Sequence, residues 1–354
     1  MCVEENKRQF APALFIAKPL AIITINQINN IMRTFKNYIV KASSIGMFII
    51  VSSTFLFMQS CKNDKKETQH ETVVEEMENI IEIITKNMDF QMPDIISSGW
   101  NTFRYKNLSP QTHFFLIDKY PEGKTSEDAE KLVAPVFDSA MKLIMEGKTE
   151  EGYAEFAKLP EWFGEVVFVG GSGLLSPNQI GETTLNLKPG KYIIECYVKM
   201  SNGVFHTSMG MTKDIIVSDT DSGNKALTSD IDISISSTDG IVFNNSISSG
   251  KHIFSVLYKD QITHENFVGH DINLVKLDEN ANLEELENWM NWANPKGLIE
   301  PVPNAVTFLG GVNDMPEGNI GYFSANLEPG NYALISEVPN ASSKNMLKTF
   351  EVVK

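Results

Sequence analysis

Short apolar runs separated by polar residues fill most of the chain after residue 77. Residues 182–187 (ETTLNL) alternate polar and apolar positions, and residues 191–198 (KYIIECYV) form a denser apolar run. Runs of this length, rich in β-branched and aromatic residues and bounded by Pro-Gly pairs, are typical of β-strands. Several short strands of this kind predict a β-sandwich.

This strand pattern occurs twice, with its parts in the same order. The matched segments are ISSGWNTF at 96–103 and ISSGKHIF at 247–254, FVGG at 168–171 and FLGG at 308–311, LKPGKY at 187–192 and LEPGNY at 327–332, and MTKDIIV at 211–217 and MLKTFEV at 346–352. Four matches in order indicate two tandem units. We therefore predict a first domain at 77–218, a linker at 219–229 and a second domain at 230–354.

Each unit also contains one segment with helical spacing. In the first unit, Thr125 and Asp128 stand as a capping box before the helix, and Pro135 is expected to kink or split it. The apolar face of this segment holds Leu132, Val133, Val136, Phe137, Met141 and Ile144.

The helical segment of the second unit begins with Asn282 and Glu285 in the same capping arrangement. It carries two tryptophans, Trp289 and Trp292. We interpret both as packing residues rather than as a platform for a ligand.

Residues 33–61 have the order of an export signal. Basic residues come first, an apolar stretch at 45–58 follows, and Gln59-Ser60-Cys61 closes it. The apolar stretch is short for a membrane-spanning helix, which needs about 20 apolar residues. A cysteine after a small residue at this place resembles the lipidation site of Bacteroidetes-type lipoproteins. The alternative is an uncleaved anchor helix with an incidental cysteine.

Three N-terminal segments follow from this interpretation. Met32 directly precedes the basic start of the signal, so residues 1–31 are interpreted as a mis-called upstream extension and 32–60 as the signal peptide. Cys61 would then be the lipidated first residue of the mature protein. Residues 61–76 are polar and charged, which is typical of a flexible tether.

The charge distribution argues against a nucleic-acid partner. Residues 1–60 hold six Lys+Arg and two Asp+Glu, and the rest of the chain holds 24 and 43. Binding of nucleic-acid phosphates needs a basic face, and a chain with this excess of acidic residues does not indicate one. The three cysteines stand at 2, 61 and 196 in unlike settings, so they do not form a disulfide framework.

The first unit resembles a cupredoxin domain. Its opening, IIEIITKNMDFQMPDIISSGWNTFRYKNLSPQTHFFLIDKY, has the strands that lead to a histidine, and its close, LKPGKYIIECYVKMSNGVFHTSMGMTKDIIV, has a strand ending in cysteine and a loop with histidine and Gly-Met. The resemblance covers most of 78–218 and, more weakly, 229–354. It implies Greek-key β-sandwiches, each with a helical insertion, and one copper ion held for electron transfer.

The residues of the first unit match the ligand chemistry of such a site. A blue-copper site uses two imidazoles, one thiolate and a weak axial thioether. The first unit has two histidines, His113 and His206, and one cysteine, Cys196. The family register favours Met211 as the axial ligand, with Met209 as the alternative.

Two features depart from the simplest copper-binding pattern. Nine residues separate Cys196 from His206, whereas many copper-binding cupredoxins have two to four there. In the second unit, Ser336 aligns with Cys196, His270 with His113 and Met346 with Met211, and no histidine matches His206. The second domain is therefore expected to be degenerate and to hold no copper.

The sequence thus favours a non-enzymatic, lipid-anchored protein of the cell envelope, attached to the outer membrane through Cys61. The first domain would hold copper for electron transfer or copper handling, with a protein as redox partner. The alternative is a binding or structural module of two sandwiches without metal. A third class is a thiol enzyme, in which Cys196 would need a base and a further group that orients the base. His206 could serve as the base, but no orienting group is evident.

Overall fold

The computed structural model describes residues 80–354 except residue 245, and these residues belong to one compact unit, Val74–Lys354. The predicted extension, signal peptide, Cys61 lipidation site and tether lie outside the described residues. In the part of the chain that is described, no helix is long and apolar enough to cross a bilayer. The predicted domain boundaries stay predictions.

The first repeat contains strands β1 to β7 and the second contains β8 to β16. The strands are β1 (Ile80–Thr85), β2 (Ile95–Asn107), β3 (Leu116–Lys119), β4 (Val167–Gly171), β5 (Ile180–Leu187), β6 (Gly190–Glu195), β7 (Thr212–Asp221), β8 (Ile231–Ser236), β9 (Gly240–Phe243), β10 (Ile247–Ser248), β11 (Gly250–Tyr258), β12 (Ile272–Leu277), β13 (Val306–Val312), β14 (Ile320–Leu327), β15 (Gly330–Ile335) and β16 (Leu347–Val353).

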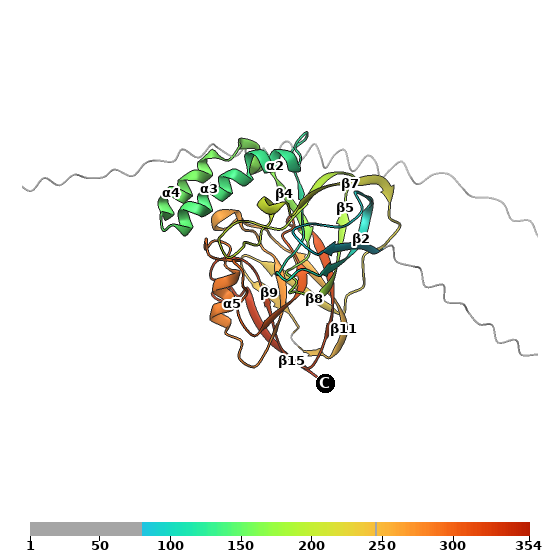
Figure 1. The fold of residues 1–354 in the computed structure, drawn as a ribbon. Coiled ribbons are helices and arrows are strands. Elements are labelled where there is room, and N and C mark those ends of the chain that lie inside the picture. Colours follow the sequence, from blue (N-terminus) through green and yellow to red (C-terminus); the bar gives the residue numbers. More distant parts are fainter. Residues whose placement is uncertain (1–79, 245) are drawn as a thin grey trace, which may run out of the picture. The chain divides into compact units, whose positions relative to one another are not determined.

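Helices occur mainly between β3 and β4 and between β12 and β13, the same place in each repeat. The α-helices are α2 (Ser126–Leu132), α3 (Ala134–Met145), α4 (Thr149–Glu155) and α5 (Leu283–Met290), and the short 3₁₀ helices are η1 (Phe156–Lys158), η2 (Glu161–Glu165), η3 (Thr207–Met209) and η4 (Glu265–Phe267). Figure 1 shows α2, α3 and α4 grouped beside the strands.

In the first repeat, the long strand β2 belongs to both layers of a sandwich. Its start pairs in parallel with β7, and its second half pairs with β5 and β1. The other layer continues from β7 through β6 and β3 to β4. The rings of Phe103 and Tyr105 on β2 lie 5.4 and 5.7 Å from the ring of Phe115, so side chains between the layers form one aromatic core.

The second repeat is built in the same way and shares a sheet with the first. One layer has the order β14-β11-β8-β9, and the other has β10-β16-β15-β12-β13. Phe243 on β9 meets Phe350 on β16 across the core, with ring centroids 5.5 Å apart. Strand β14 pairs antiparallel with β5, which makes one sheet continuous through both sandwiches. The predicted fold class, two tandem β-sandwiches with a helical insertion in each, is confirmed.

The strand register confirms the predicted equivalence of Cys196 and Ser336. Cys196 directly follows β6, and Ser336 directly follows β15. The N–H of Cys196 donates to the carbonyl of Met211 (3.3 Å), and the N–H of Ser336 donates to the carbonyl of Met346 (3.0 Å). The two methionines are therefore equivalent as well.

The same hydrogen bonds identify the counterpart of His206, which the sequence alignment left without a partner. The N–H of Met211 donates to the carbonyl of His206 (3.0 Å), and that of Met346 donates to the carbonyl of Ala341 (2.7 Å). Ala341 therefore takes the place of His206, at the end of a shorter loop.

The predicted equivalence of His113 and His270 also follows from strand pairing. His113 lies three residues before Leu116, which pairs with Glu195 on β6. His270 lies three residues before Asn273, which pairs with the last residue of β15. Both histidines thus enter the same end of their sandwich.

The helical insertion of the first repeat follows its sequence signals. Thr125 and Asp128 form the capping box before α2, and the predicted split occurs at Val133, where Pro135 occupies the first turn of α3. The prediction that Leu132 shares the apolar face of this segment is wrong, because Leu132 ends α2 and is 46% exposed.

The helix of the second repeat also begins where its cap predicts. The Asn282 side chain accepts from the N–H groups of Glu284 and Glu285 at the start of α5. Trp289 is buried in the core, and its ring N–H donates to the carbonyl of Ile299 (2.7 Å). This agrees with its interpretation as a packing residue.

A buried lysine joins the two repeats. The Lys199 N–H donates to the carbonyl of Leu298 (2.8 Å), and its Nζ donates to the carbonyl of Pro295 (3.2 Å). The residue is 2% exposed, and Nζ lies 4.6 Å from the ring centre of Trp292. Burial lowers the pKa of Lys199 to about 7, although the Glu337 carboxyl acts in the opposite direction.

Lys199 should therefore make the stability depend on pH. Its folded-state pKa of about 7 lies below its ordinary value of 10.5. The folded chain then binds fewer protons between these pH values, so the Lys199 contribution should become more favourable as pH rises. Urea unfolding at pH 7.5 and 9.5 should show this rise in the parent protein, and Lys199→Met should reduce it. Exposed Lys188→Met should retain it, and a rise of equal size in Lys199→Met would contradict the assignment.

Candidate metal centre

The end of strand β6 places Cys196 in the interior. The strand residues before it, Ile193 and Ile194, are buried, so the chain carries Cys196 into the core at the point where β6 ends. Its N–H is bonded to the Met211 carbonyl, which fixes the backbone at the position of the sulfur.

The loop between β2 and β3 places His113. The Asn107 side-chain amide donates to the carbonyls of Gln111 and Leu175, both at 2.8 Å, and the His113 N–H donates to the same Leu175 carbonyl (3.1 Å). The ring Nε2 of His113 lies 2.9 Å from the Ser109 hydroxyl oxygen. This contact holds the ring by one nitrogen and leaves Nδ1 facing Cys196.

The long loop after β6 folds back and brings His206 beside Cys196. The N–H of His206 donates to the carbonyl of Val198 (2.8 Å), and the Thr207 hydroxyl donates to the carbonyl of Cys196 (2.9 Å). With the bond from Met211 to the His206 carbonyl, both ends of the loop are attached to the backbone around Cys196. His206 therefore lies beside Cys196, although nine residues separate the two in the chain.

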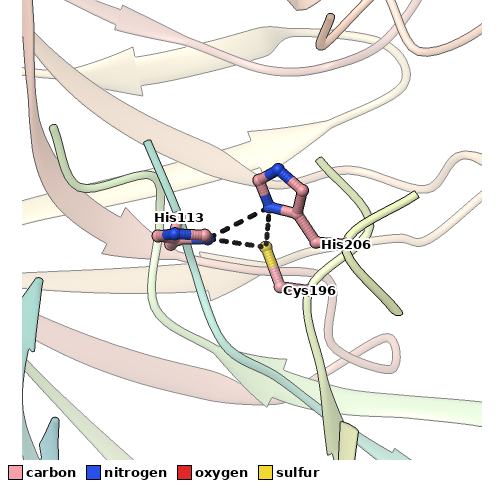
Figure 2. Close-up of side chains that lie close together, drawn as sticks. All are labelled: His113, Cys196 and His206. Carbon is pink, nitrogen blue, oxygen red and sulfur yellow. Dashed lines mark hydrogen bonds between the residues drawn. The ribbon is translucent and has the colours of Figure 1, made fainter. Parts of the chain in front are cut away.

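Three of the predicted ligands converge, as Figure 2 shows. The Cys196 sulfur lies 3.8 Å from Nδ1 of His113 and 3.7 Å from Nδ1 of His206, and the two nitrogens lie 3.1 Å apart. All three side chains are fully buried. Metal–imidazole and metal–thiolate bonds of about 2.0–2.3 Å place neighbouring ligand atoms roughly 3–4 Å apart, so this spacing fits a metal ion.

Burial keeps this group of side chains neutral. It raises the pKa of the Cys196 thiol to about 12. Burial lowers the pKa of His113 to about 3, with a smaller effect from His206, and lowers the pKa of His206 to about 4. Neutral imidazoles keep a lone pair for a metal, and a metal ion must displace the proton of the thiol to bind it.

The two candidate axial methionines lie in different environments. Met211 is fully buried and is bonded through its backbone to both Cys196 and His206. Met209 ends the short helix η3, and its side chain is 47% exposed. The axial thioether of a buried metal site is shielded from water, so the exposure of Met209 disfavours it as the axial ligand.

The equivalent place in the second repeat has a serine instead of the thiol, and Ala341 stands where the first repeat has His206. The Ser336 hydroxyl donates to Oδ1 of Asp271 (2.7 Å), and Nε2 of His270 lies 3.1 Å from Nε2 of His264. Within residues 80–244 and 246–354, His113, Cys196 and His206 are the only three His, Cys, Asp or Glu residues whose ligand atoms all approach within 4.8 Å.

Sequence reasoning missed Ser109 and Thr207, which hold His113 and the His206 loop. Their hydrogen bonds occur within loops and depend on the folded path of the backbone. A serine four residues before a histidine is no signal by itself, because this spacing carries meaning only in a helix.

The sequence matches no protein-family model and no curated protein sequence. Solved structures similar to the chain include reduced auracyanin from Roseiflexus castenholzii, at 20% identity over 39% of this chain and 94% of that chain, with a TM-score of 0.24. Auracyanin A, a blue copper protein from Chloroflexus aurantiacus, has 21% identity over 39% of this chain and 97% of its own, with a TM-score of 0.24.

A copper-containing nitrite reductase from Thermus scotoductus SA-01 has 12% identity over 78% of this chain and 61% of its own, with a TM-score of 0.19. These TM-scores are too low to carry an argument about this chain.

Proposed function

We propose that the first domain binds one copper ion in a type 1-like site and that the protein serves in electron transfer or copper handling. The observation that supports this most strongly is the convergence of Cys196, His113 and His206 in a fully buried group. Two imidazoles and one thiolate are the strong ligands of blue-copper sites. Bound copper would supply one-electron redox chemistry.

The surrounding residues suit that chemistry. The three ligands are buried, so water is excluded from the place where a change of oxidation state would otherwise rearrange solvent. The backbone bonds that link Met211 to the two residues Cys196 and His206 restrict movement of the loop. The Ser109 hydroxyl holds the far nitrogen of His113 and restricts the rotation of its ring.

Metal analysis of the purified mature protein tests this function most simply. We expect about one copper ion per chain after loading and removal of free metal. A protein that retains no metal would favour the alternative, a binding or structural module of two sandwiches. Zinc retained in preference to copper would also contradict the redox function.

Met211→Leu should change the reduction potential and preserve the colour. The axial thioether is a weak ligand that tunes the potential, whereas the thiolate and the imidazoles hold the ion. We expect a higher potential and nearly unchanged copper content, measured by redox titration of the copper-loaded protein. Met209→Leu is the matched control, because Met209 is exposed. An equal shift in both variants would exclude Met211 as the axial ligand.

The cellular location is part of the proposal and rests on sequence alone. Cys61 would carry the lipid that attaches the mature protein to the outer membrane, and residues 61–76 would act as the tether. Cys61→Ala should move the protein from the detergent phase to the aqueous phase or block its processing. Translation from Met32 should give the same mature product. A parent protein found wholly in the aqueous phase would exclude the lipid anchor.

A further inference from the structure

A cavity lies near the candidate metal centre, between the helical insertion of the first repeat and loops of both repeats. Its volume is about 110 Å³. Much of the wall is aromatic, formed by Phe137, Phe163, Tyr197, Phe205, Phe267 and Trp292. These residues come from α3, η2, η4 and the loops after β6 and α5, so the cavity depends on the close packing of the two repeats.

Carboxyl groups form another part of the same wall, namely those of Glu195, Asp271, Asp314 and Glu337. Two of them are bonded by the chain itself. Oδ1 of Asp271 accepts from the Ser336 hydroxyl and from the Glu337 N–H, both at 2.7 Å. Oδ1 of Asp314 accepts from the side-chain amide of Gln261 (2.7 Å).

Glu337 is different, because one of its oxygens has no partner among the described residues. Its Oε2 accepts from the Tyr197 hydroxyl (3.0 Å), whereas Oε1 is buried without a hydrogen bond. The residue is 1% exposed and lines the cavity. A buried carboxyl oxygen without a donor is costly, so this atom marks a place for a donor from outside the chain.

Two rings of the aromatic wall already lie beside the amino group of Lys199. Nζ of Lys199 lies 4.6 Å from the ring centre of Trp292 and 5.4 Å from that of Phe205. Lys199 and these two rings line a smaller neighbouring cavity. Lys199 does not line the cavity that contains Glu337. The faces of such rings attract cations, and this attraction grows when water is excluded.

We propose that this cavity binds a small organic ammonium ion that carries at least one N–H group. The ammonium would donate to Oε1 of Glu337, and its hydrocarbon part would lie against Phe205 and Trp292. The cavity, at about 110 Å³, is smaller than the apolar protein cavity of about 150 Å³ that accommodates benzene, but it is not closed off from solvent, so part of a small ligand can extend out of it. The ligand class is therefore a primary amine with one ring or a short chain.

An inorganic cation fits the cavity less well. Such an ion needs several oxygen ligands close to one another. In the described residues, no three of the cavity's carboxyl groups bring their oxygens within 4.8 Å of one another. Burial raises the pKa of Glu337 and of Asp314 well above their usual range, and the nearby Lys199 lowers that of Glu337 only in part.

Benzylammonium and its neutral isostere, benzyl alcohol, provide a test that needs no mutation. Isothermal titration of the copper-free mature protein should show saturable binding of benzylammonium at one per chain. Its affinity should exceed that of benzyl alcohol by about tenfold or more. Tetramethylammonium, which has no N–H group, should bind more weakly than benzylammonium. Equal affinities for benzylammonium and benzyl alcohol, or no benzylammonium binding, would overturn the proposal.

A variant locates the binding in this cavity. Glu337→Gln keeps the shape and cannot become a carboxylate opposite the ammonium, so benzylammonium affinity should fall by about tenfold. Glu182→Gln, on β5 and outside the cavity, should bind as the parent does. If circular dichroism shows that Glu337→Gln is unfolded, Trp292→Leu serves in its place and should also weaken binding. Unchanged affinity in a folded cavity variant, or displacement of benzylammonium by millimolar calcium at constant ionic strength, would contradict the assignment.

The same titration with Cys196→Ser separates this inference from the copper proposal. Binding of benzylammonium should persist in that variant, because Cys196 does not line the cavity. Loss of benzylammonium binding in folded Cys196→Ser would place the ligand in the candidate metal centre and overturn the proposal.

Discussion

Cys196→Ser should abolish the intense colour that copper(II) gives with the parent protein. That colour requires charge transfer from a thiolate, and Cys196 is the free cysteine of the described residues. A hydroxyl group is a much poorer ligand for copper than a thiolate. Loss of a residue that only supports a ligand lowers metal affinity by about 10–100-fold. Loss of the Cys196 ligand itself should lower the affinity for copper by more than that. Visible absorption and competition with a chelator measure the two effects.

Ser336→Ala is the matched control for this variant. Ser336 occupies the place of Cys196 in the second repeat, and its hydroxyl donates to Asp271. It should leave the colour and the copper content unchanged. Retention of the colour in Cys196→Ser, or its loss in Ser336→Ala, would contradict the assignment of the site to the first repeat.

Gly311→Ala should destabilise the fold by about 3 kcal/mol, the sum of overpacking and backbone strain. A Cβ on Gly311 would lie 1.9 Å from the carbonyl oxygen of Ile272, and the residue has a φ of +146°. Gly171, its counterpart in the first repeat, would bring a Cβ to 2.0 Å from the carbonyl oxygen of Phe115. Both glycines pair next to a β-bulge, where two strands come unusually close.

Gly164→Ala provides the comparison for this stability effect. Gly164 does not have a positive φ, and a Cβ there would meet nothing within 4 Å. It should be neutral or slightly stabilising, because alanine reduces the freedom of the unfolded chain. Urea unfolding measures both variants. Equal stability of Gly311→Ala and the parent would show that the strands can separate at no cost, contrary to the tight packing described.

The sequence could predict the ligand types and the repeat because both leave local signals. Cys196 ends an apolar strand, and the second repeat has a serine at the same register, so the comparison of the two units identified the unit with the complete ligand set. The place of Ala341 could not be predicted, since two loops of different length have no alignment without their backbone hydrogen bonds.

Contacts between the repeats were also beyond sequence reasoning. The pairing of β5 with β14 joins two strands that each look like the edge of an independent sandwich. The cavity beside Glu337 is lined by residues of both repeats, so it could not be predicted from either repeat alone. Capping was predictable at Thr125 and Asn282, because a cap and its helix are adjacent in the chain.

X-ray absorption at the copper edge of the loaded protein tests the proposed site most directly. The account predicts one sulfur ligand from Cys196 and two imidazole ligands from His113 and His206, with the sulfur absent in Cys196→Ser. A first coordination shell of nitrogen and oxygen alone in the parent protein would contradict it.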